Sequence, residues 1–126
     1  MVNDVPASRQ YIEQGDVFWI DMEDPYGSEP GGRRPYVVVQ NNMFNFSRID
    51  TVVACAITSN QNQALSPGNV LLNSGEADLP RRSVVNISQI VTLDKQVFIE
   101  RIGTLSSKRM QEIISGLRLL LEPREP

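Results

Sequence analysis

The spacing of apolar side chains along the chain predicts mostly short strands. Six segments are rich in Val, Ile and aromatic residues and are bounded by Gly, Pro, Asn or Ser, as strands usually are. These segments are residues 15–22, 34–40, 51–58, 69–72, 83–91 and 97–103. The apolar run at 36–39 is continuous, which indicates a strand buried on both faces. A polar, Asn-rich segment at 41–47 is typical of a turn or a single helical turn.

One of these strands, residues 51–58, alternates clearly. Successive side chains of a strand point to opposite faces. One face therefore carries Val52, Ala54, Ala56 and Thr58, and the other carries Val53, Cys55 and Ile57. The alternation predicts that Thr58, at the end of the strand, faces away from Cys55.

The C-terminal part of the chain changes to helical spacing. Its apolar residues recur three or four positions apart. They are Met110, Ile113, Ile114, Leu117, Leu120 and Leu121. Ser106 or Ser107 is suited to cap the start of this helix, and Pro123 is suited to end it. We expect an amphipathic helix that packs against a sheet or the end of a barrel.

Six short strands and a final helix predict a mainly β, α+β fold, a small twisted β-barrel that is partly open. The 126 residues fit one domain, which we place at 14–126 after a flexible leader at 1–13. No apolar run approaches the roughly 18–20 residues needed to cross a bilayer. The N-terminus lacks the basic and apolar regions of a signal peptide.

Two rare residue types exclude several kinds of site. The chain has no histidine, which excludes a histidine general base, a Ser–His–Asp triad, a Cys–His dyad and a histidine metal site. Its one cysteine, Cys55, excludes an intramolecular disulfide and a thiolate zinc cluster. We expect Cys55 to be a core residue in a reducing, cytoplasmic protein without a metal cofactor.

The net charge of −3 argues against nonspecific binding to nucleic acid, but the charge is unevenly distributed. Residues 1–30 hold seven acidic side chains and one arginine, whereas residues 31–126 hold eleven basic and eight acidic side chains. A basic face is therefore compatible with an acidic protein.

The most distinctive candidate site is the adjacent pair Arg33 and Arg34. The pair follows Gly31 and Gly32 and stands where a Gly-rich loop meets a strand. A guanidinium binds phosphate oxygens in a bidentate manner, and glycines allow a ligand to approach closely. The alternative is a pair of surface arginines that makes the loop more soluble.

Other polar residues have both a functional and a structural interpretation. Ser28 suits a hydrogen bond to phosphate or a turn, and Glu29 suits proton transfer or a solvated surface. Thr58 suits anion binding or a turn, and Gln89 suits base recognition or a satisfied buried amide. A second basic pair, Arg81 and Arg82, favours a broad anion-binding groove. We place Trp19 in the core or at a dimer interface.

Several motifs coincide in order and spacing with a known family. GDVFWIDM, the loop GSEPGG, RRPYVVVQNN and TVVACAITS are followed by ISQIVTLDK and IGTL. Together they closely resemble the MazF/PemK toxins of type II toxin–antitoxin modules, over residues 14–121. The resemblance implies an SH3-like or CcdB-like barrel, a homodimer, and a metal-independent endoribonuclease (an mRNA interferase) that cleaves single-stranded mRNA sequence-specifically. It also implies a cognate antitoxin, an acidic and partly disordered peptide that occupies the RNA groove.

The resemblance assigns roles residue by residue. Arg34, before the proline, and Thr58, at the end of the next strand, match the residues usually given catalytic roles. Ser28, Glu29 and Gln89 match positions that line the RNA groove, and we add the basic residues Arg33, Arg81 and Arg82 to the expected RNA-binding set. In this scheme the RNA 2′-hydroxyl attacks the adjacent phosphorus and leaves a 2′,3′-cyclic phosphate and a 5′-hydroxyl, with Arg34 stabilising the developing charge.

The chain departs from the family pattern at two places. Pro30 stands where many members have glutamine, and we expect it to stiffen the loop that gates RNA entry. The plasmid-borne branch is credited with an arginine and an aspartate where this chain has Asn86 and Ser88, so the acid/base scheme of that branch does not carry over. Glu29, a water or Arg34 remain candidates for the base.

Two other functions remain open at this stage. One is a non-catalytic, CcdB-like toxin that binds DNA gyrase through its C-terminal helix. The other is a small binding module without activity. The combination of Arg34, Thr58 and the GSE loop favours the nuclease.

Overall fold

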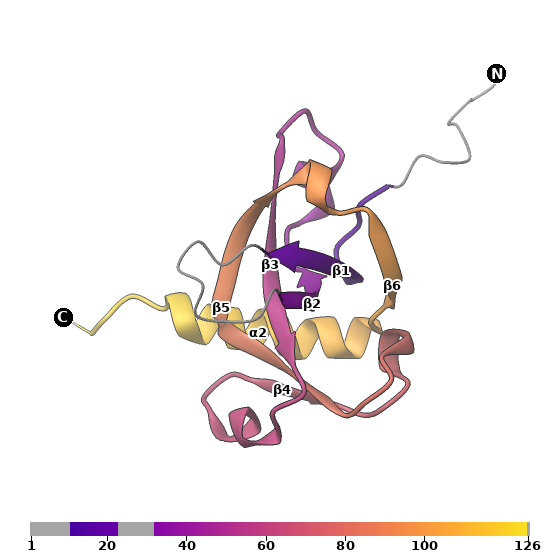
Figure 1. Ribbon diagram of the computed structural model, residues 1–126. Coiled ribbons are helices and arrows are strands. Elements are labelled where there is room, and N and C mark those ends of the chain that lie inside the picture. The colour runs from indigo at the N-terminus through magenta and orange to yellow at the C-terminus, as the bar shows by residue number, and fades with distance from the viewer. Residues whose placement is uncertain (1–10, 23–31, 126) are drawn as a thin grey trace.

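The computed structural model describes residues 11–22 and 32–125, and its main element is one curled antiparallel sheet (Figure 1). The strands lie in the order β4-β5-β3-β2-β1-β6. Their bounds are β1 Asp16–Met22, β2 Gly32–Val38, β3 Thr51–Thr58, β4 Val70–Leu72, β5 Ser83–Asp94 and β6 Glu100–Thr104. The predicted partly open barrel of six strands is confirmed.

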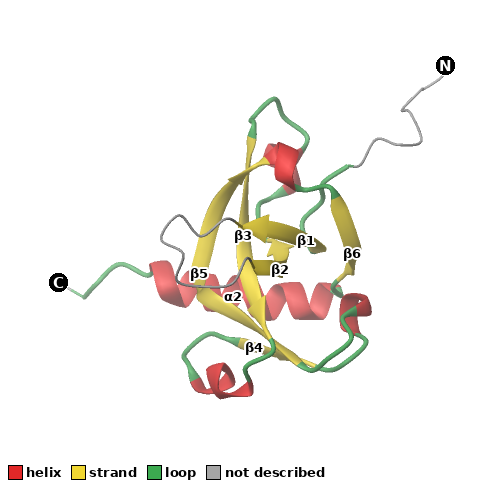
Figure 2. Cartoon of the chain, viewed as in Figure 1, coloured by secondary structure: helices red, strands yellow, loops and turns green. Residues whose placement is uncertain are grey.

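Two α-helices and three short 3-10 turns connect and cover the strands (Figure 2). Their bounds are α1 Asn42–Asn45, η1 Gln61–Leu65, η2 Glu76–Asp78, η3 Lys95–Val97 and α2 Ser107–Leu121. The single helical turn expected at 41–47 is α1, and the side chain of Asn41 caps it. Within the described part of the chain, no helix has the length and apolar character that a membrane crossing requires.

Both faces of the central strands are buried, as the continuous apolar run of β2 predicts. The first core contains Val37, Cys55 and residues of α2, and the second contains Tyr36, Val38, Ala54 and Ala56. Val37 and Val38 are each fully buried although they point to opposite faces. The predicted alternation in β3 is confirmed, because its odd and even residues belong to different cores.

The C-terminal helix α2 packs across the first core with one face only. Ser106 caps its start by accepting a hydrogen bond from the amide of Arg109, and the helix ends before Pro123 as expected. Met110, Ile113 and Leu117 are buried. Leu120 and Leu121 were expected on the packed face, but they are exposed because α2 extends past the edge of the sheet (Figure 1).

The chain between β5 and β6 differs from the expected boundaries. β5 continues to Asp94, and the turn η3 replaces the start of the strand expected at 97–103. Phe98 follows this turn and is buried, with its ring edge-on to Phe18 at 5.3 Å between centroids. The packing of this aromatic pair on the second core explains why the chain turns here before β6 begins.

Of the flexible leader expected at residues 1–13, the structure describes only residues 11–13, because residues 1–10 lie outside the described part of the chain. Ile12 is buried in the second core. The amide of Glu13 donates to Asp16, at the start of β1. The packed part of the domain therefore includes residues just before position 14.

Candidate functional site

A pocket of about 420 Å³ lies where β2 begins and β3 ends. Residues from β1, from β2, from the end of β3 and from the loop before β5 line it. They are Trp19, Arg33, Arg34, Pro35, Ile57, Thr58, Ser59, Leu79, Pro80, Arg81 and Ser83. Four of the residues singled out from the sequence, Arg33, Arg34, Thr58 and Arg81, therefore share one pocket.

Arg34 and Thr58 approach one another because of the strand register. The antiparallel pairing sets Tyr36 opposite Ala56; Arg34 and Thr58 each lie two residues beyond this pair, and both line the pocket. Both side chains are half-buried. Strand-end positions on two paired strands hold a cation and a hydroxyl on one side of the pocket.

The Thr58 hydroxyl has a defined orientation. Its oxygen accepts a hydrogen bond from the backbone amide of Asn60 at 3.1 Å. Since a hydroxyl can donate one hydrogen bond while it accepts others, the proton of Thr58 is available for an anionic oxygen in the pocket. Thr58 can therefore donate a hydrogen bond to a ligand in the pocket.

Arg33 has a different environment from Arg34. Its guanidinium forms an ion pair with Glu100 of β6 and lies 5.3 Å from the ring centroid of Trp19. Trp19 is half-buried and lines the pocket, so of its two expected places the core is wrong, and the dimer interface stays a prediction. Trp19 sits opposite Pro35 in the pairing of β1 with β2, which brings its ring next to Arg33.

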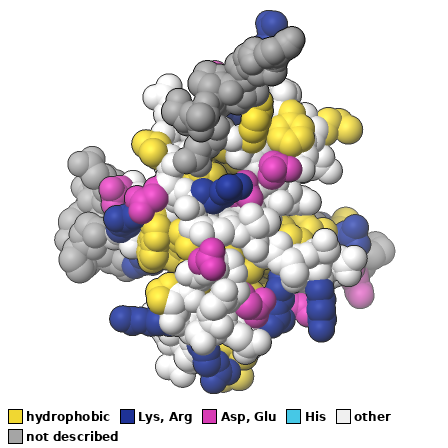
Figure 3. Space-filling view, turned by 90° about the vertical axis from the view of Figure 1, so that its right-hand side faces the viewer, with side chains coloured by type: hydrophobic (Ala, Val, Ile, Leu, Met, Phe, Trp, Pro, Cys, Tyr) yellow, Lys and Arg dark blue, Asp and Glu magenta, His cyan; other side chains and the backbone are white. Residues whose placement is uncertain are grey.

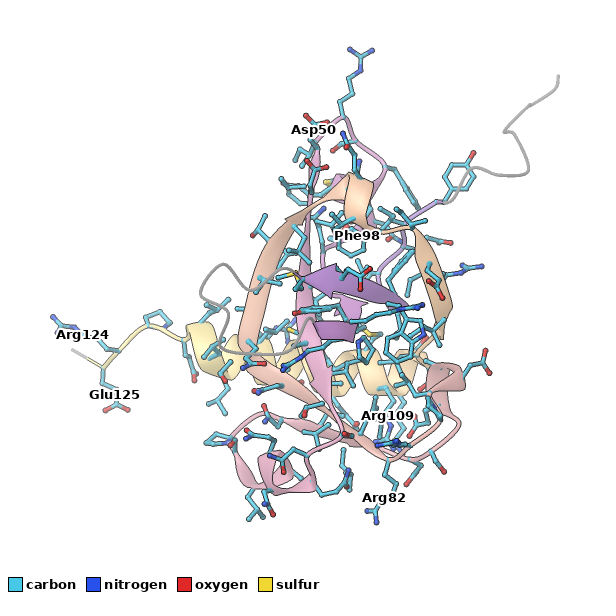
Figure 4. The ribbon with its side chains drawn as sticks, viewed as in Figure 1. Asp50, Arg82, Phe98, Arg109, Arg124 and Glu125 are labelled. Atoms are coloured by element: carbon cyan, nitrogen blue, oxygen red, sulfur yellow. The ribbon has the colours of Figure 1, made fainter. Side chains whose placement is uncertain are left out.

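Only one residue of the second basic pair, Arg81 and Arg82, lines the pocket. Arg81 lines the pocket, and its carbonyl oxygen accepts a hydrogen bond from the Ser83 hydroxyl at 2.9 Å. Arg82 does not line the pocket, and its side chain points away from the body of the molecule (Figure 4). The backbone carbonyl of Arg82 accepts a hydrogen bond from Gln61, which also donates to Ser59.

Gln89 is exposed on β5 and does not line the pocket, so the interpretation as a buried amide is wrong. It lies where the pairing of β5 with β3 shifts: Cys55 pairs with Ile90, but Ile57 pairs with Val85. In the same stretch the Ser88 hydroxyl donates to Asn86 at 3.0 Å. These two neutral side chains are hydrogen-bonded to each other and supply no acid or base.

The residues that border the pocket give it a positive character. Three arginines line it, and none of the described lining residues is acidic. Figure 3, seen from the side of β6, shows acidic and basic side chains mixed over that face, in contrast to the all-basic charge of the pocket. A positively charged pocket with hydroxyl donors suits a phosphate oxygen.

The described residues support neither a thiol nucleophile nor a metal site. Cys55 is fully buried in the first core, and this burial raises the pKa of its thiol to about 12. The thiol is therefore protonated at neutral pH and unsuited to nucleophilic attack. No cluster of three or more Asp, Glu, Cys or His side chains that could hold a metal ion occurs in residues 11–22 and 32–125.

Ser28 and Glu29, and with them Pro30, lie outside the described residues. Sequence reasoning missed the contributions of Trp19, Ser59, Pro80 and Ser83 to the pocket. The position of Pro80 beside two arginines was a usable signal, because it fixes the loop from which Arg81 extends. Trp19 carried no such signal, since an aromatic residue in an apolar strand is usually buried.

Comparison with known proteins identifies the family. The model of the PemK-like, MazF-like toxin of type II toxin–antitoxin systems matches residues 13–121. The chain is 43% identical over 111 residues to Endoribonuclease MazF6 of Mycobacterium tuberculosis H37Rv, covering 88% of this chain and 97% of the relative. Endoribonuclease MazF of Staphylococcus saprophyticus is 36% identical over 110 residues, covering 87% and 91%. This chain belongs to the PemK/MazF-like toxin family.

Solved structures of family members share the fold. A mycobacterial endoribonuclease in complex with its cognate antitoxin superposes with a TM-score of 0.72 at 24% identity, covering 90% of this chain and 98% of that one. The MazE–MazF structure from Deinococcus radiodurans gives a TM-score of 0.74 at 23% identity, covering 92% and 100%. The expected resemblance to PemK/MazF toxins is confirmed.

Proposed function

We propose that this PemK/MazF-like toxin is an endoribonuclease that cleaves single-stranded mRNA at specific sequences without a metal ion. One observation carries the proposal: Arg34 and Thr58 share a positively charged pocket with Arg33 and Arg81. The relatives of 36–43% identity are named endoribonucleases, which favours this activity over gyrase binding or a module without activity.

The proposed reaction uses the RNA itself as the nucleophile. The oxygen of the 2′-hydroxyl attacks the adjacent phosphorus and loses its proton. The bond from phosphorus to the 5′-oxygen breaks, and that oxygen takes up a proton. The products are a 2′,3′-cyclic phosphate and a 5′-hydroxyl, so no water is consumed in this step.

Arg34 and Thr58 act on the transition state of this step. Negative charge grows on the non-bridging oxygens, and a guanidinium held in a half-buried pocket stabilises it without reorganisation. The Thr58 hydroxyl adds a hydrogen bond to the same oxygens. No carboxylate is among the described residues that line the pocket, so Glu29, water and Arg34 remain the candidates for the proton acceptor.

The remaining binding residues hold the rest of the strand. We propose that Arg33 and Arg81, which line the pocket, contact phosphates beside the scissile one, and that Trp19 stacks on an unstacked base. Gln89 and Arg82 lie outside the pocket, so we propose that they contact RNA further along a groove. Ser28 and Glu29 complete the proposed set.

The proposed partners follow from the same charge pattern. A cognate antitoxin would place an acidic peptide over the arginines and so exclude RNA. The solved mycobacterial relative is in complex with its cognate antitoxin, which supports this partner. We propose a cytoplasmic homodimer. The single buried thiol of Cys55 suits a reducing compartment, and the exposed leucines at the end of α2 suit a subunit contact.

Analysis of the cleaved ends tests the proposed function. Purified protein is incubated with a long single-stranded RNA in EDTA, and the fragments are sequenced after treatment that distinguishes their ends. We expect cuts at one short motif, with 2′,3′-cyclic phosphate and 5′-hydroxyl ends. Fragments with 5′-phosphate ends, or activity that EDTA abolishes and magnesium restores, would contradict the proposed mechanism.

A further inference from the structure

A strained turn next to the pocket is held from outside it by an ion pair. The turn is η2, between β4 and β5, and it is followed by Leu79, Pro80 and Arg81 of the pocket lining. The inference about this turn rests on the proposed function, because it concerns how Arg81 is presented to RNA.

The ion pair joins the turn to the C-terminal helix. From α2, Arg109 donates through Nε to one carboxylate oxygen of Glu76 at 2.9 Å and through Nη2 to the other at 2.8 Å. The second oxygen also accepts the amide of Asn73 at 2.8 Å. Both charged side chains are about three-quarters buried. A bidentate pair of this kind fixes direction as well as distance. Figure 4 shows Arg109 between α2 and the loop of η2.

The backbone of the turn would not adopt its conformation without support. Ala77 and Asp78 have φ values of 51° and 59°, in the left-handed region, which alanine avoids and aspartate enters more readily. Such conformations persist where the surroundings over-determine them. Gly103 of β6 provides part of this support, because a Cβ there would lie 2.6 Å from the carbonyl oxygen of Ala77.

The turn is connected to the pocket by a short and rigid path. The amide of Gly75 donates to the carbonyl of Leu79 at 2.7 Å, which closes the turn. Leu79 is 2% exposed and belongs to the first core while it lines the pocket. The carbonyl of Arg81, two residues later, is held by Ser83. A closed turn and one buried side chain, that of Leu79, therefore lie between Glu76 and Arg81.

We propose that Glu76 and Arg109 are positioning residues for RNA binding. Their ion pair holds the η2 turn so that Arg81 meets a phosphate of the bound strand. Neither residue contacts the RNA. Loss of the pair frees Arg81 from its place and weakens RNA binding. Arg34 of β2 and Thr58 of β3 are unaffected, so the rate of the chemical step stays the same.

A double-mutant cycle tests this coupling. Glu76→Gln, Arg81→Ala and the double variant are compared with the wild type in KM and kcat for a short RNA, and in affinity for the same RNA with a 2′-deoxy sugar at the cleavage site. We expect Glu76→Gln to raise KM several-fold at nearly unchanged kcat. It should have no further effect once Arg81 is absent. Each single variant should lose about one phosphate contact. The slope of the logarithm of the binding constant against the logarithm of the salt concentration should then change by about 0.7.

Glu112→Gln is the matched control. Glu112 also accepts a hydrogen bond from Arg109, at 2.9 Å, but it lies on α2 itself and does not reach the turn. We expect its KM and salt slope to match the wild type. If Glu76→Gln fails to fold in a thermal unfolding scan, Arg109→Lys replaces it, because lysine keeps the charge and loses the bidentate geometry.

The outcomes separate this inference from the proposed function. Equal effects of Glu76→Gln with and without Arg81, or an unchanged KM in a folded Glu76→Gln protein, would overturn the positioning role. A wild-type protein that neither binds nor cleaves RNA would overturn the proposed function instead.

Discussion

Arg33 and Arg34 are neighbours in the chain, but they have different surroundings. Arg33 forms an ion pair with Glu100 and a cation–π contact with Trp19. Arg34 is half-buried, on the strand that pairs with β3. Successive side chains of a strand alternate between its faces, but at the start of β2 both arginines border the same pocket. From the sequence, the two adjacent arginines could be predicted to bind phosphate. The family resemblance then selected Arg34 as the catalytic one. The ion pair of Arg33 depends on a strand more than sixty residues away and could not be predicted.

The hydroxyl of Thr58 can be tested by changing this one side chain. Thr58→Val keeps the shape and removes the hydroxyl, so the transition state loses one hydrogen bond. We expect kcat to fall by about 10²–10³, the usual effect of losing one preorganised donor. A fluorogenic oligonucleotide measures the rate. Thr51→Val, an exposed position at the other end of β3, should leave kcat unchanged. An equal loss in both variants would indicate an effect on the strand rather than on the reaction.

At the scale of elements, a contact between two backbones joins α2 to the loop before β4. Gly116 of α2 lies against Gly68, and a Cβ at Gly116 would overlap the Gly68 carbonyl oxygen. Glycine normally weakens a helix by about 1 kcal/mol relative to alanine. At this position the close approach outweighs that cost, because a side chain would push α2 away from the loop before β4.

Gly116→Ala should therefore destabilise the protein despite the better helix propensity of alanine. We expect a loss of about 1–3 kcal/mol in the free energy of unfolding, as for overpacked cores. Urea denaturation measures it. Ser115→Ala, at the exposed neighbouring position, should change stability by less than about 0.5 kcal/mol. A more stable Gly116→Ala protein would show that α2 does not pack closely on this loop.

The ion pair between η2 and α2 predicts how stability depends on pH. The hydrogen bond from Arg109, with the hydrogen bond from the Asn73 amide and the charge of Arg109, holds the pKa of Glu76 below its usual 4.5. A carboxylate with a lowered folded-state pKa stabilises the protein above its unfolded-state pKa, and this contribution is lost as the pH falls through the folded-state value.

We therefore expect the wild type to lose stability below about pH 4.5 more steeply than Glu76→Gln does. Thermal unfolding between pH 3 and pH 7 measures the difference. Glu125→Gln, at an exposed C-terminal carboxylate, should follow the wild-type curve. Parallel curves for the wild type and Glu76→Gln would mean that this carboxylate does not titrate differently in the folded state.

Much of the element structure could be predicted from local pattern. Apolar runs located the six strands, and Ser106 and Pro123 marked the ends of α2. The 3-10 turns and the left-handed conformations of Ala77 and Asp78 could not be predicted, because tertiary contacts impose them. The exposed end of α2 was also missed, since periodicity shows where an apolar face lies but not how far the sheet extends beneath it.

At the scale of the whole molecule, the fold gathers the site from distant parts of the chain. Trp19, Arg34, Thr58 and Arg81 lie on three strands and one loop, yet they border one pocket. The sequence singled out Arg34, Thr58 and Arg81 as candidate site residues but not Trp19, and the meeting of all four depends on the order of strands in the sheet. The same architecture concentrates positive charge in a protein whose net charge is −3.

The central claim is that Arg34 is the catalytic cation of an RNA-cleaving pocket. The most direct test measures kcat and KM for a single-stranded RNA with folded Arg34→Ala and Arg33→Ala proteins. We expect Arg34→Ala to lower kcat by at least about 10²-fold and Arg33→Ala to act mainly on KM. Unchanged cleavage by Arg34→Ala, or an equal loss of kcat in both variants, would contradict this claim.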